Sequence, residues 1–525
     1  MRSAHEDHFI REGLPSKDAQ PEFLFDLPSL QYPERLNAAV ALIDGRDPDA
    51  LAVLNDAGRW TCRRMADLSD RVARLLVERE GLVPGNRVFL RGPNGAHLLA
   101  AWLGVLKAGG IVVATMPMLR PGEIATILER VRINHAIVDS RFQADFDASG
   151  GTPSTIVYDG DTSFSALDEI ESGFAPIDTH RDDIALIAFT SGTTGQPKGC
   201  IHYHRDVLAS ADSFARHILD PQPGDRWACS APLAFTFGLG MQFVFPLRFG
   251  GTAVTVEKPG PKPLLEAIAR HGVTTLATAP TAYKAMIPLL AQNDIATLRT
   301  CVSAGEHLPA AIWHAWKDAT GLSIVDGIGA TEMMHIFISA SGDDIRPGST
   351  GKAVPGYVAT VLDEANRPMD AGTGRLAVKG PTGCRYFDDP RQASYVAGGW
   401  NLTGDTYRKD DDGYFWYLAR SDDMIISSGY NIAAPEVENA LLSHPAVQEC
   451  AVVGAPCEER GQIVKAFVVL SSGYAPDAIT VTALQDHAKA EIAPYKYPRE
   501  IEFVADLPKT ATGKLQRFAL REDGR

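Results

Sequence analysis

The chain has 525 residues, of which 45% are hydrophobic and 22% charged, and its formal net charge is −15. This length exceeds what one hydrophobic core normally supports, so we expect at least two domains of ordinary globular composition. The acidic balance argues against a nucleic-acid or anionic-membrane surface, although an acidic protein can still hold a local basic pocket for phosphates.

The seven cysteines are scattered and form neither a CxxC pair nor a His/Cys ligand cluster. An odd, scattered set is typical of reduced thiols in a cytoplasmic protein. The charged N-terminus lacks the apolar core of a signal peptide, and no apolar run is long enough to span a bilayer. We therefore expect a cytoplasmic protein without a membrane segment.

Alternating helix and strand patterns follow a Pro-rich, charged segment over residues 1–35, which we expect to wrap over a surface. A helical pattern over 61–81 precedes a strand at 87–90, a helix at 95–107 and a strand at 111–114. Strand–helix–strand units of this kind predict a parallel sheet covered by helices.

The same alternation continues through most of the chain. Further strand candidates are 136–139, 154–158, 251–256, 273–277, 299–303 and 322–326. Between 348 and 417, short strands with frequent Gly, Pro and Asp predict a small antiparallel, barrel-like element. The predicted fold class is α/β, with a large N-terminal domain of doubly wound, mostly parallel sheets plus this element.

A charged, Gly-rich stretch at 420–429 marks a domain boundary, which divides the chain into 1–420 and 421–525. Beyond it, Pro435 suits the first turn of a helix, and strands at 448–453 and 464–470 precede a helix at 481–491. The sequence thus predicts a small α+β C-terminal domain.

The most distinctive segment, residues 190–199, reads Thr-Ser-Gly-Thr-Thr-Gly-Gln-Pro-Lys-Gly. Its hydroxyls, glycines and lysine can direct N–H groups, O–H groups and a cation at one anion, which we expect to be a nucleotide polyphosphate. An apolar strand at 184–189 precedes it and a helical pattern at 204–218 follows, so we expect the loop to join a strand to a helix. A flexible linker is the alternative interpretation, but a linker needs neither that strand nor the lysine. A Walker A motif is excluded, because neither Lys352 nor Lys514 is followed by Ser or Thr.

These ten residues closely resemble the phosphate loop of the adenylate-forming superfamily, which includes acyl-CoA synthetases, luciferases and peptide-synthetase adenylation domains. Other motifs match in the right order, so the resemblance covers essentially the whole chain. It implies ATP, Mg²⁺ and coenzyme A as cofactors, and two half-reactions. An acid first attacks the α-phosphate of ATP and expels pyrophosphate; a thiol then attacks the acyl-adenylate and expels AMP, while the small C-terminal domain moves between the two steps.

The resemblance assigns residue roles around the triphosphate. The residues expected at the β- and γ-phosphates are Thr190, Ser191, Gly192, Thr193, Thr194 and Lys198. Thr331 is expected to contact the α-phosphate and Glu332 to help hold Mg²⁺, although a Thr-Glu pair alone is typical of a helix cap. Cations and N–H donors aimed at the developing charge suit this chemistry.

The ribose is assigned to Asp405, whose carboxylate can accept two hydrogen bonds, and to Arg420. Without the surrounding motif, Asp405 would be interpreted as a turn aspartate. The residues expected to complete the nucleotide site are Gly305, Glu306 and Asp326.

Three assignments concern the C-terminal domain. Asp422 matches the hinge, and Gly429 matches a loop that lines the pantetheine channel, where a glycine lets a narrow chain pass close to the backbone. Lys514 matches the catalytic lysine, whose charge would offset the repulsion between carboxylate and α-phosphate. The alternative for Lys514 is a solvated terminal lysine.

The acid pocket is expected from segments around 235, 304 and 328–335. Its candidate residues are Phe235, Ala304, Ile328, Gly329, Met334 and His335. The run at 329–337 resembles benzoate and aminobenzoate CoA ligases, and the segments 21–37 and 201–206 resemble 2-aminobenzoate–CoA ligases. An apolar pocket of this kind suits a flat aryl ring, with His335 packing on the ring or bonding an ortho substituent. The alternatives are core filler for Met334 and a satisfied core histidine for His335.

The leading hypothesis is an ATP-dependent CoA ligase for 2-aminobenzoate. Benzoate or hydroxybenzoate is the alternative acid, and a separate carrier protein is the alternative thiol. A non-catalytic acyl-adenylate-binding protein is the hypothesis from outside the enzyme class. His202 and His204 have no third ligand nearby, so no metal site is expected there. The chain is expected to be a monomer or a homodimer.

Overall fold

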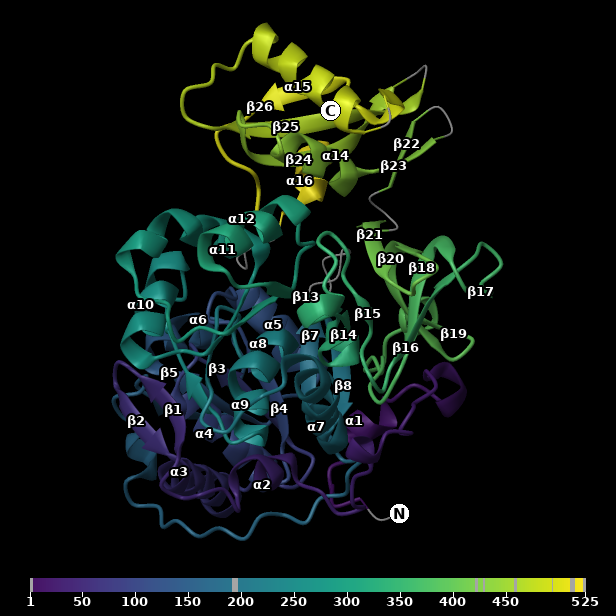
Figure 1. Cartoon of the computed structure of the whole chain (residues 1–525). Helices are drawn as coiled ribbons and strands as arrows, with labels where there is room; N and C mark the ends of the chain where they lie inside the picture. The colour runs from purple at the N-terminus through teal and green to yellow at the C-terminus, as the bar shows by residue number, and fades with distance from the viewer. Residues whose placement is uncertain are drawn as a thin grey trace.

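The structure, a computed structural model, describes residues 3–190, 197–420, 424–427, 430–457, 460–492, 494–509 and 515–522. A large body of sheets and helices carries the N-terminus, and a smaller body at the top of Figure 1 carries the C-terminal elements. Within the described residues, no helix combines the length and the apolar character needed to cross a membrane.

The first sheet has six strands in the order β6-β5-β3-β4-β7-β8. They are β3 (Arg87–Arg91), β4 (Ile111–Thr115), β5 (His135–Asp139), β6 (Ser154–Tyr158), β7 (Ile184–Thr190) and β8 (Lys198–Tyr203). All neighbours pair in parallel except β7 and β8, which are antiparallel. Every residue of β3 is buried, including the arginines at its two ends, as expected for a parallel strand covered on both faces.

The second sheet has nine strands in the order β15-β14-β13-β12-β11-β9-β10-β1-β2. They are β1 (Leu51–Asn55), β2 (Gly58–Thr61), β9 (Arg226–Cys229), β10 (Thr252–Val254), β11 (Thr275–Thr278), β12 (Thr300–Ser303), β13 (Ile324–Gly329), β14 (Ile336–Ser339) and β15 (Lys352–Ala353). The strands from β1 to β13 along this order are parallel, and the edges are antiparallel.

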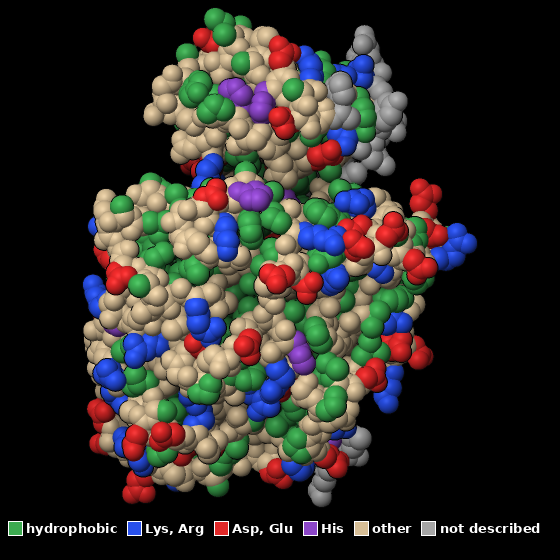
Figure 2. Space-filling model, viewed as in Figure 1, with side chains coloured by type: hydrophobic (Ala, Val, Ile, Leu, Met, Phe, Trp, Pro, Cys, Tyr) green, Lys and Arg blue, Asp and Glu red, His purple; other side chains and the backbone are tan. Residues whose placement is uncertain are grey.

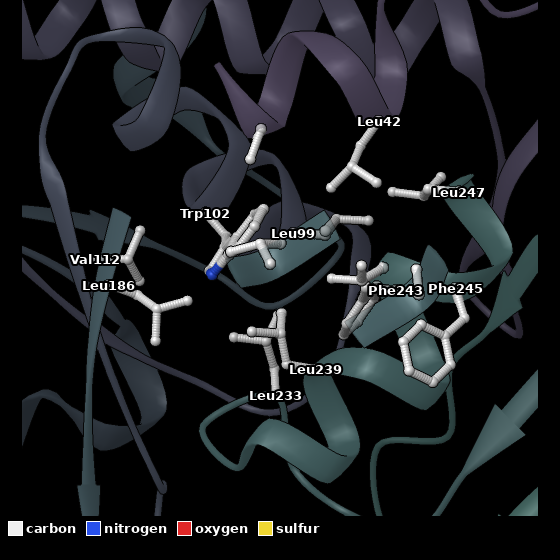
Figure 3. Packing of buried hydrophobic residues seen from close by; sticks show 14 of the residues in the cluster. Leu42, Leu99, Trp102, Val112, Leu186, Leu233, Leu239, Phe243, Phe245 and Leu247 are labelled. Carbon is white, nitrogen blue, oxygen red and sulfur yellow. The ribbon is translucent and has the colours of Figure 1, made fainter. Parts of the chain in front are cut away.

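Helices cover both sheets. The longer ones in the large body are α3 (Cys62–Arg74), α4 (Ala96–Lys107), α5 (Pro121–Arg130), α7 (His204–Ser210), α10 (Pro261–His271), α11 (Pro280–Met286) and α12 (Ala310–Thr320). Every residue of α4 is buried, because it lies between the two sheets. Figure 3 shows its Leu99 and Trp102 between Val112 and Leu186 of the first sheet and the cluster that includes Phe243. This core holds the two sheets together.

The third sheet is antiparallel, in the order β17-β16-β18-β20-β19, with β21 paired to β20. Its strands are β16 (Val358–Leu362), β17 (Pro368–Met369), β18 (Gly372–Lys379), β19 (Val396–Ala397), β20 (Trp400–Lys409) and β21 (Phe415–Arg420). This is the antiparallel element that the Gly-rich pattern predicts.

The smaller body has a sheet in the order β23-β22-β25-β24, with β26 paired to β25. Its elements are β22 (Met424–Ser427), β23 (Tyr430–Ala433), α14 (Ala434–Leu442), β24 (Val447–Cys457), β25 (Gly461–Leu470), α15 (Ala478–Glu491), β26 (Glu500–Phe503) and α16 (Arg517–Glu522). The predicted α/β fold with an α+β C-terminal part is confirmed. The boundary at 420/421 stays a prediction, since residues 421–423 lie outside the described ranges.

One prediction about the phosphate loop is wrong. The loop joins two strands, because β8 pairs with β7 in the register Thr190↔Lys198 and the helix begins only at His204. Residues 198–203 form a strand because a second segment, around Arg385, pairs with their other edge: the N–H of Ile201 donates to the Arg385 carbonyl at 2.8 Å. That pairing is not visible in the local pattern.

Candidate active site

The open end of the β7–β8 hairpin carries the first two candidate residues. Thr190 and Lys198 lie opposite each other in the register of the two strands. The Oγ1 atom of Thr190 is buried and has no hydrogen-bond partner among the described residues. Four further loop candidates, Ser191, Gly192, Thr193 and Thr194, lie outside the described residues.

A tyrosine that sequence reasoning missed connects Lys198 to Glu332. The Lys198 Nζ donates to the Tyr386 hydroxyl at 2.8 Å and lies 4.6 Å from the centre of its ring. The Tyr386 hydroxyl donates a short hydrogen bond to Glu332 Oε1, while Lys198 Nζ and Glu332 Oε1 are 3.9 Å apart. Burial and the Glu332 charge raise the pKa of Tyr386, so its hydroxyl stays a neutral donor. No local signal marks Tyr386, which is 188 residues from Lys198 in the sequence.

A histidine of β8 contacts the backbone of the turn that carries Thr331 and Glu332. His202 Nε2 lies 2.8 Å from the Thr331 carbonyl oxygen and is fully buried. Deeper still, Arg385 donates to Asp206 at 2.7 Å, and both side chains are fully buried. Burial opposes ionisation of Asp206, but Arg385, followed by His202 and Arg205, lowers its pKa below the usual range. A buried ion pair between Arg385 and Asp206 therefore lies behind the strand that contacts this turn.

His204, considered together with His202 as a metal ligand, contacts the backbone of a neighbouring segment. His204 Nδ1 accepts a hydrogen bond from the Ala38 N–H at 3.1 Å. Among the described residues there is no group of three or more His, Cys, Asp or Glu side chains that could hold a metal ion.

Asp405 and Arg420 are brought together by the third sheet. They are paired in register on β20 and β21, and Arg420 Nη1 lies 3.7 Å from Asp405 Oδ1. Gly404, just before the aspartate, has φ +78°, a conformation that favours glycine. Asp422, the expected hinge, lies outside the described residues.

Asp326 and Ser303 are neighbours in register on β13 and β12. Burial raises the pKa of Asp326 to about 8, and its Oδ1 atom has no hydrogen-bond partner in the described part of the chain. Two residues after β12, Gly305 is exposed and has φ +90°, and the chain bends there at Gly305 and Glu306. Because β12 and β13 are parallel neighbours, these residues share one edge of the second sheet.

His335 lies in a cluster of aromatic rings. Ring centroids lie 4.6 Å away in Phe245, 5.3 Å away in Phe214 and 5.6 Å away in Phe237. Both ring nitrogens are buried without a hydrogen-bond partner within the described ranges. Burial lowers the pKa of His335 to about 3, so the imidazole is neutral near pH 7. The role of His335 in the acid pocket stays a prediction.

The backbone around His335 is tightly constrained. Met334 is fully buried and has φ +66°, which is uncommon for a side chain of its size. A Cβ on Gly329 would lie 2.8 Å from the His335 carbonyl, and a Cβ on Gly240 would lie 2.4 Å from its ring. The remaining pocket candidates, Ala304 and Ile328, belong to the same core cluster or pack against it.

The assignment of Phe235 to the acid pocket stays a prediction. Phe235 is half-buried and precedes α8 (Thr236–Leu239), but no ring contact joins it to His335 among the described residues. Phe237, two residues later, supplies that contact. Gly429 and Lys514 lie outside the described residues.

A separate pocket of about 470 Å³, whose lining includes several charged residues, lies at the ends of β5, β6 and β10. Arg141 pairs there with Asp139 at 2.6 Å and Glu257 at 2.5 Å, and Arg270 pairs with Asp56 at 2.6 Å. It contains none of the candidate residues, and these charges are paired with one another.

Comparison with known proteins gives a consistent result. A family model described as AMP-binding enzyme matches residues 42–386, and one for the AMP-binding enzyme C-terminal domain matches 436–514. The chain is 38% identical over 513 residues to benzoate–CoA ligase of Thauera aromatica, covering 94% of this chain and 97% of that protein.

Two solved structures are similar throughout. The anthranilate CoA ligase AuaEII in complex with anthranoyl-AMP has a TM-score of 0.90 and 35% identity, covering 95% of this chain and 99% of that one. A benzoate CoA ligase from Burkholderia xenovorans LB400 has a TM-score of 0.86 and 33% identity, covering 93% and 100%. The chain therefore belongs to the family of AMP-binding enzymes.

Proposed function

We propose that this protein is an aryl-acid–CoA ligase that forms an aryl-adenylate from ATP and then an aryl-CoA thioester, with release of pyrophosphate and AMP. The observation that carries the proposal is the place of His335. Its neutral, unpaired imidazole lies among phenylalanine rings three residues after Glu332, so an aryl-binding environment adjoins the expected phosphate site. The benzoate and anthranilate ligases among its relatives support the same reaction.

The first half-reaction must bring two anions together, the aryl carboxylate and the α-phosphate. Lys198 and Thr190, which lie opposite each other in register, would neutralise and hydrogen-bond the leaving pyrophosphate. Thr331 would contact the α-phosphate, and Lys514 would bridge it to the carboxylate. Because these groups act on charge that develops in the transition state, they lower its free energy more than that of the ground state.

Mg²⁺ is usually held in such sites by one or two carboxylates together with the substrate phosphates. Glu332 fits this role, since its Oε1 atom is occupied by Tyr386 while Oε2 has no hydrogen bond to a described residue. When bound, the ion would neutralise phosphate charge.

We assign the ribose of ATP to Asp405 and Arg420. The remaining contacts with the nucleoside are assigned to Gly305, Glu306 and Asp326, along the edge of the second sheet. A carboxyl group that stays protonated near pH 7 can donate a hydrogen bond, which Asp326 could direct at the nucleotide. We assign Gly429 to the pantetheine path and Asp422 to the hinge of the C-terminal domain.

Within the aryl acids, we propose 2-aminobenzoate as the preferred substrate, ahead of benzoate and hydroxybenzoate. A buried imidazole without partners costs free energy, and a polar ring substituent would satisfy it. Unsubstituted benzoate offers no such group.

The thiols and the surface charges bear on where the enzyme works and on the kind of substrate it takes. All seven cysteines are free, in keeping with a cytoplasmic enzyme. Figure 2 shows lysine, arginine, aspartate and glutamate interspersed over the visible face of the large body, which suits small-molecule substrates better than a polyanion. We expect a monomer or a homodimer.

The identity of the thiol is tested by AMP release with purified enzyme, ATP, acid and CoA, without carrier protein. CoA-dependent AMP release supports the ligase. Acid-dependent ATP–pyrophosphate exchange without CoA turnover would favour loading of a carrier protein, and absence of both would favour a non-catalytic adenylate-binding protein.

A further inference from the structure

One hydroxyl group stands between the two charged side chains of the phosphate site. The Tyr386 oxygen accepts a hydrogen bond from Lys198 at 2.8 Å, and the same hydroxyl donates a hydrogen bond to Glu332. The ammonium and the carboxylate are thereby kept 3.9 Å apart. A direct charge-assisted hydrogen bond between them would be closer to 2.8 Å.

The position of this hydroxyl is fixed by the fold. Tyr386 is 1% exposed and forms a bridge with Cys200 of β8. Its N–H donates to Gln392 Oε1 at 2.9 Å, and Gln392 in turn donates to the Ala19 carbonyl at 2.9 Å. Tyr395 packs on its ring edge, with centroids 5.7 Å apart. Contacts with several segments therefore hold the tyrosine in place independently of Lys198 and Glu332.

The hydrogen bond from Tyr386 determines which carboxylate oxygen of Glu332 is available to a ligand. Its Oε1 atom is occupied by Tyr386, while its Oε2 atom has no hydrogen bond to a described residue. Without the hydroxyl, Lys198 is free to close directly on the carboxylate and to occupy either oxygen. The pair would then neutralise itself and be less available to a phosphate or a metal ion.

We propose that Tyr386 is a positioning residue for adenylate formation, whose hydroxyl orients Glu332 toward Mg²⁺·ATP and prevents Lys198 from pairing directly with it. The proposal rests on the proposed function, because it assigns Tyr386 to the first half-reaction of that ligase. Tyr386 acts through its two neighbours and need not touch the reacting atoms.

The test is Tyr386→Phe, which keeps the ring and removes only the hydroxyl. We expect ATP–pyrophosphate exchange with benzoate to fall about ten-fold in kcat, and the Mg²⁺ concentration for half-maximal exchange to rise about three-fold or more. Thioester formation from supplied benzoyl-AMP and CoA should stay within about three-fold of the wild type. Calorimetric titration with α,β-methylene-ATP should show a matching loss of Mg²⁺-dependent affinity.

The matched control is Tyr395→Phe. Its ring lies 5.8 Å from the Lys198 Nζ, but its hydroxyl has no hydrogen bond to Lys198 or Glu332. In a Glu332→Gln background, Tyr386→Phe should cost less than about two-fold in exchange, because the group through which it acts is already changed.

Equal loss of both half-reactions, unchanged Mg²⁺ dependence, or full additivity in the Glu332→Gln background would overturn the proposal. If the wild type catalyses no acid-dependent exchange, the proposed function fails by itself. The calorimetric titration still decides the role of Tyr386 in that case, because it measures Mg²⁺·nucleotide binding without turnover.

Discussion

Asp405 and Arg420 face each other across β20 and β21, with 3.7 Å between Arg420 Nη1 and Asp405 Oδ1. The guanidinium holds a buried carboxylate at the end of the sheet, where it can accept both hydroxyls of a ribose. We expect Asp405→Ala to raise the KM for ATP by about ten-fold or more, because charge-assisted hydrogen bonds to the nucleotide are lost. Steady-state kinetics with varied ATP measure this.

The control is Asp411→Ala, an exposed aspartate in the turn between the same two strands. Its KM for ATP should equal that of the wild type. An unchanged KM in Asp405→Ala would remove Asp405 from the nucleotide site.

We expect His335 to control discrimination between ring substituents. His335→Phe keeps an aromatic ring among Phe214, Phe237 and Phe245 but removes both nitrogens. The ratio of kcat/KM for 2-aminobenzoate over benzoate should fall about ten-fold, since a site that hydrogen-bonds a substituent rejects analogues lacking it. Competition assays with both acids give this ratio directly. An unchanged ratio would mean that His335 does not recognise the substituent.

Asp326 makes stability depend on pH. Burial raises its pKa from 3.8 to about 8, so the folded state holds a proton that the unfolded state releases. The contribution is fully present below about pH 4 and is lost progressively as the pH rises through about 8. Asp326→Asn should therefore flatten the decline of the urea unfolding midpoint between pH 5 and pH 8. If the unfolding midpoint declined equally in the wild type and in Asp326→Asn, the pH dependence would come from other groups.

The buried pair of Asp206 and Arg385 supports the turn that carries Thr331. Asp206→Ala leaves Arg385 buried without its partner, which typically costs about 3–5 kcal/mol. Asp178→Ala removes a similar pair at the surface, with Arg35 at 2.9 Å, and should cost less than about 1 kcal/mol. Urea unfolding of the two variants compares these values. Similar stabilities would show that the buried network does not support the fold.

We expect Lys514 to act in only one of the two half-reactions. Lys514→Ala should lose adenylate formation, because no cation then offsets the repulsion between carboxylate and α-phosphate, yet keep thioester formation from supplied aryl-adenylate. Separate assays of pyrophosphate exchange and thioester formation test this. Equal loss in both would assign Lys514 a different role.

The fold is most predictable where a strand is buried on both faces. β5, which is buried at every residue, reads as a short apolar run, and its predicted range agrees with the structure to within one residue. β8 is different: residues 198–203 mix Lys, Gly, Cys, Ile, His and Tyr without a clear period. Its strand conformation comes from pairing with β7 and with the segment around Arg385, far away in the sequence.

The same distinction applies to the site. Thr331, Glu332, Asp405 and Lys198 stand in contiguous motifs, so a linear sequence is enough to single them out. Tyr386 has its role only through contacts with Lys198 and Glu332, which no sequence spacing indicates.

Activation of aryl acids is the activity that we propose for this chain. It is tested most directly by CoA-dependent AMP release across benzoate, aminobenzoates, hydroxybenzoates and aliphatic acids, compared as kcat/KM. We expect the highest value for an aryl acid, with 2-aminobenzoate first. A highest value for a medium-chain fatty acid would contradict it.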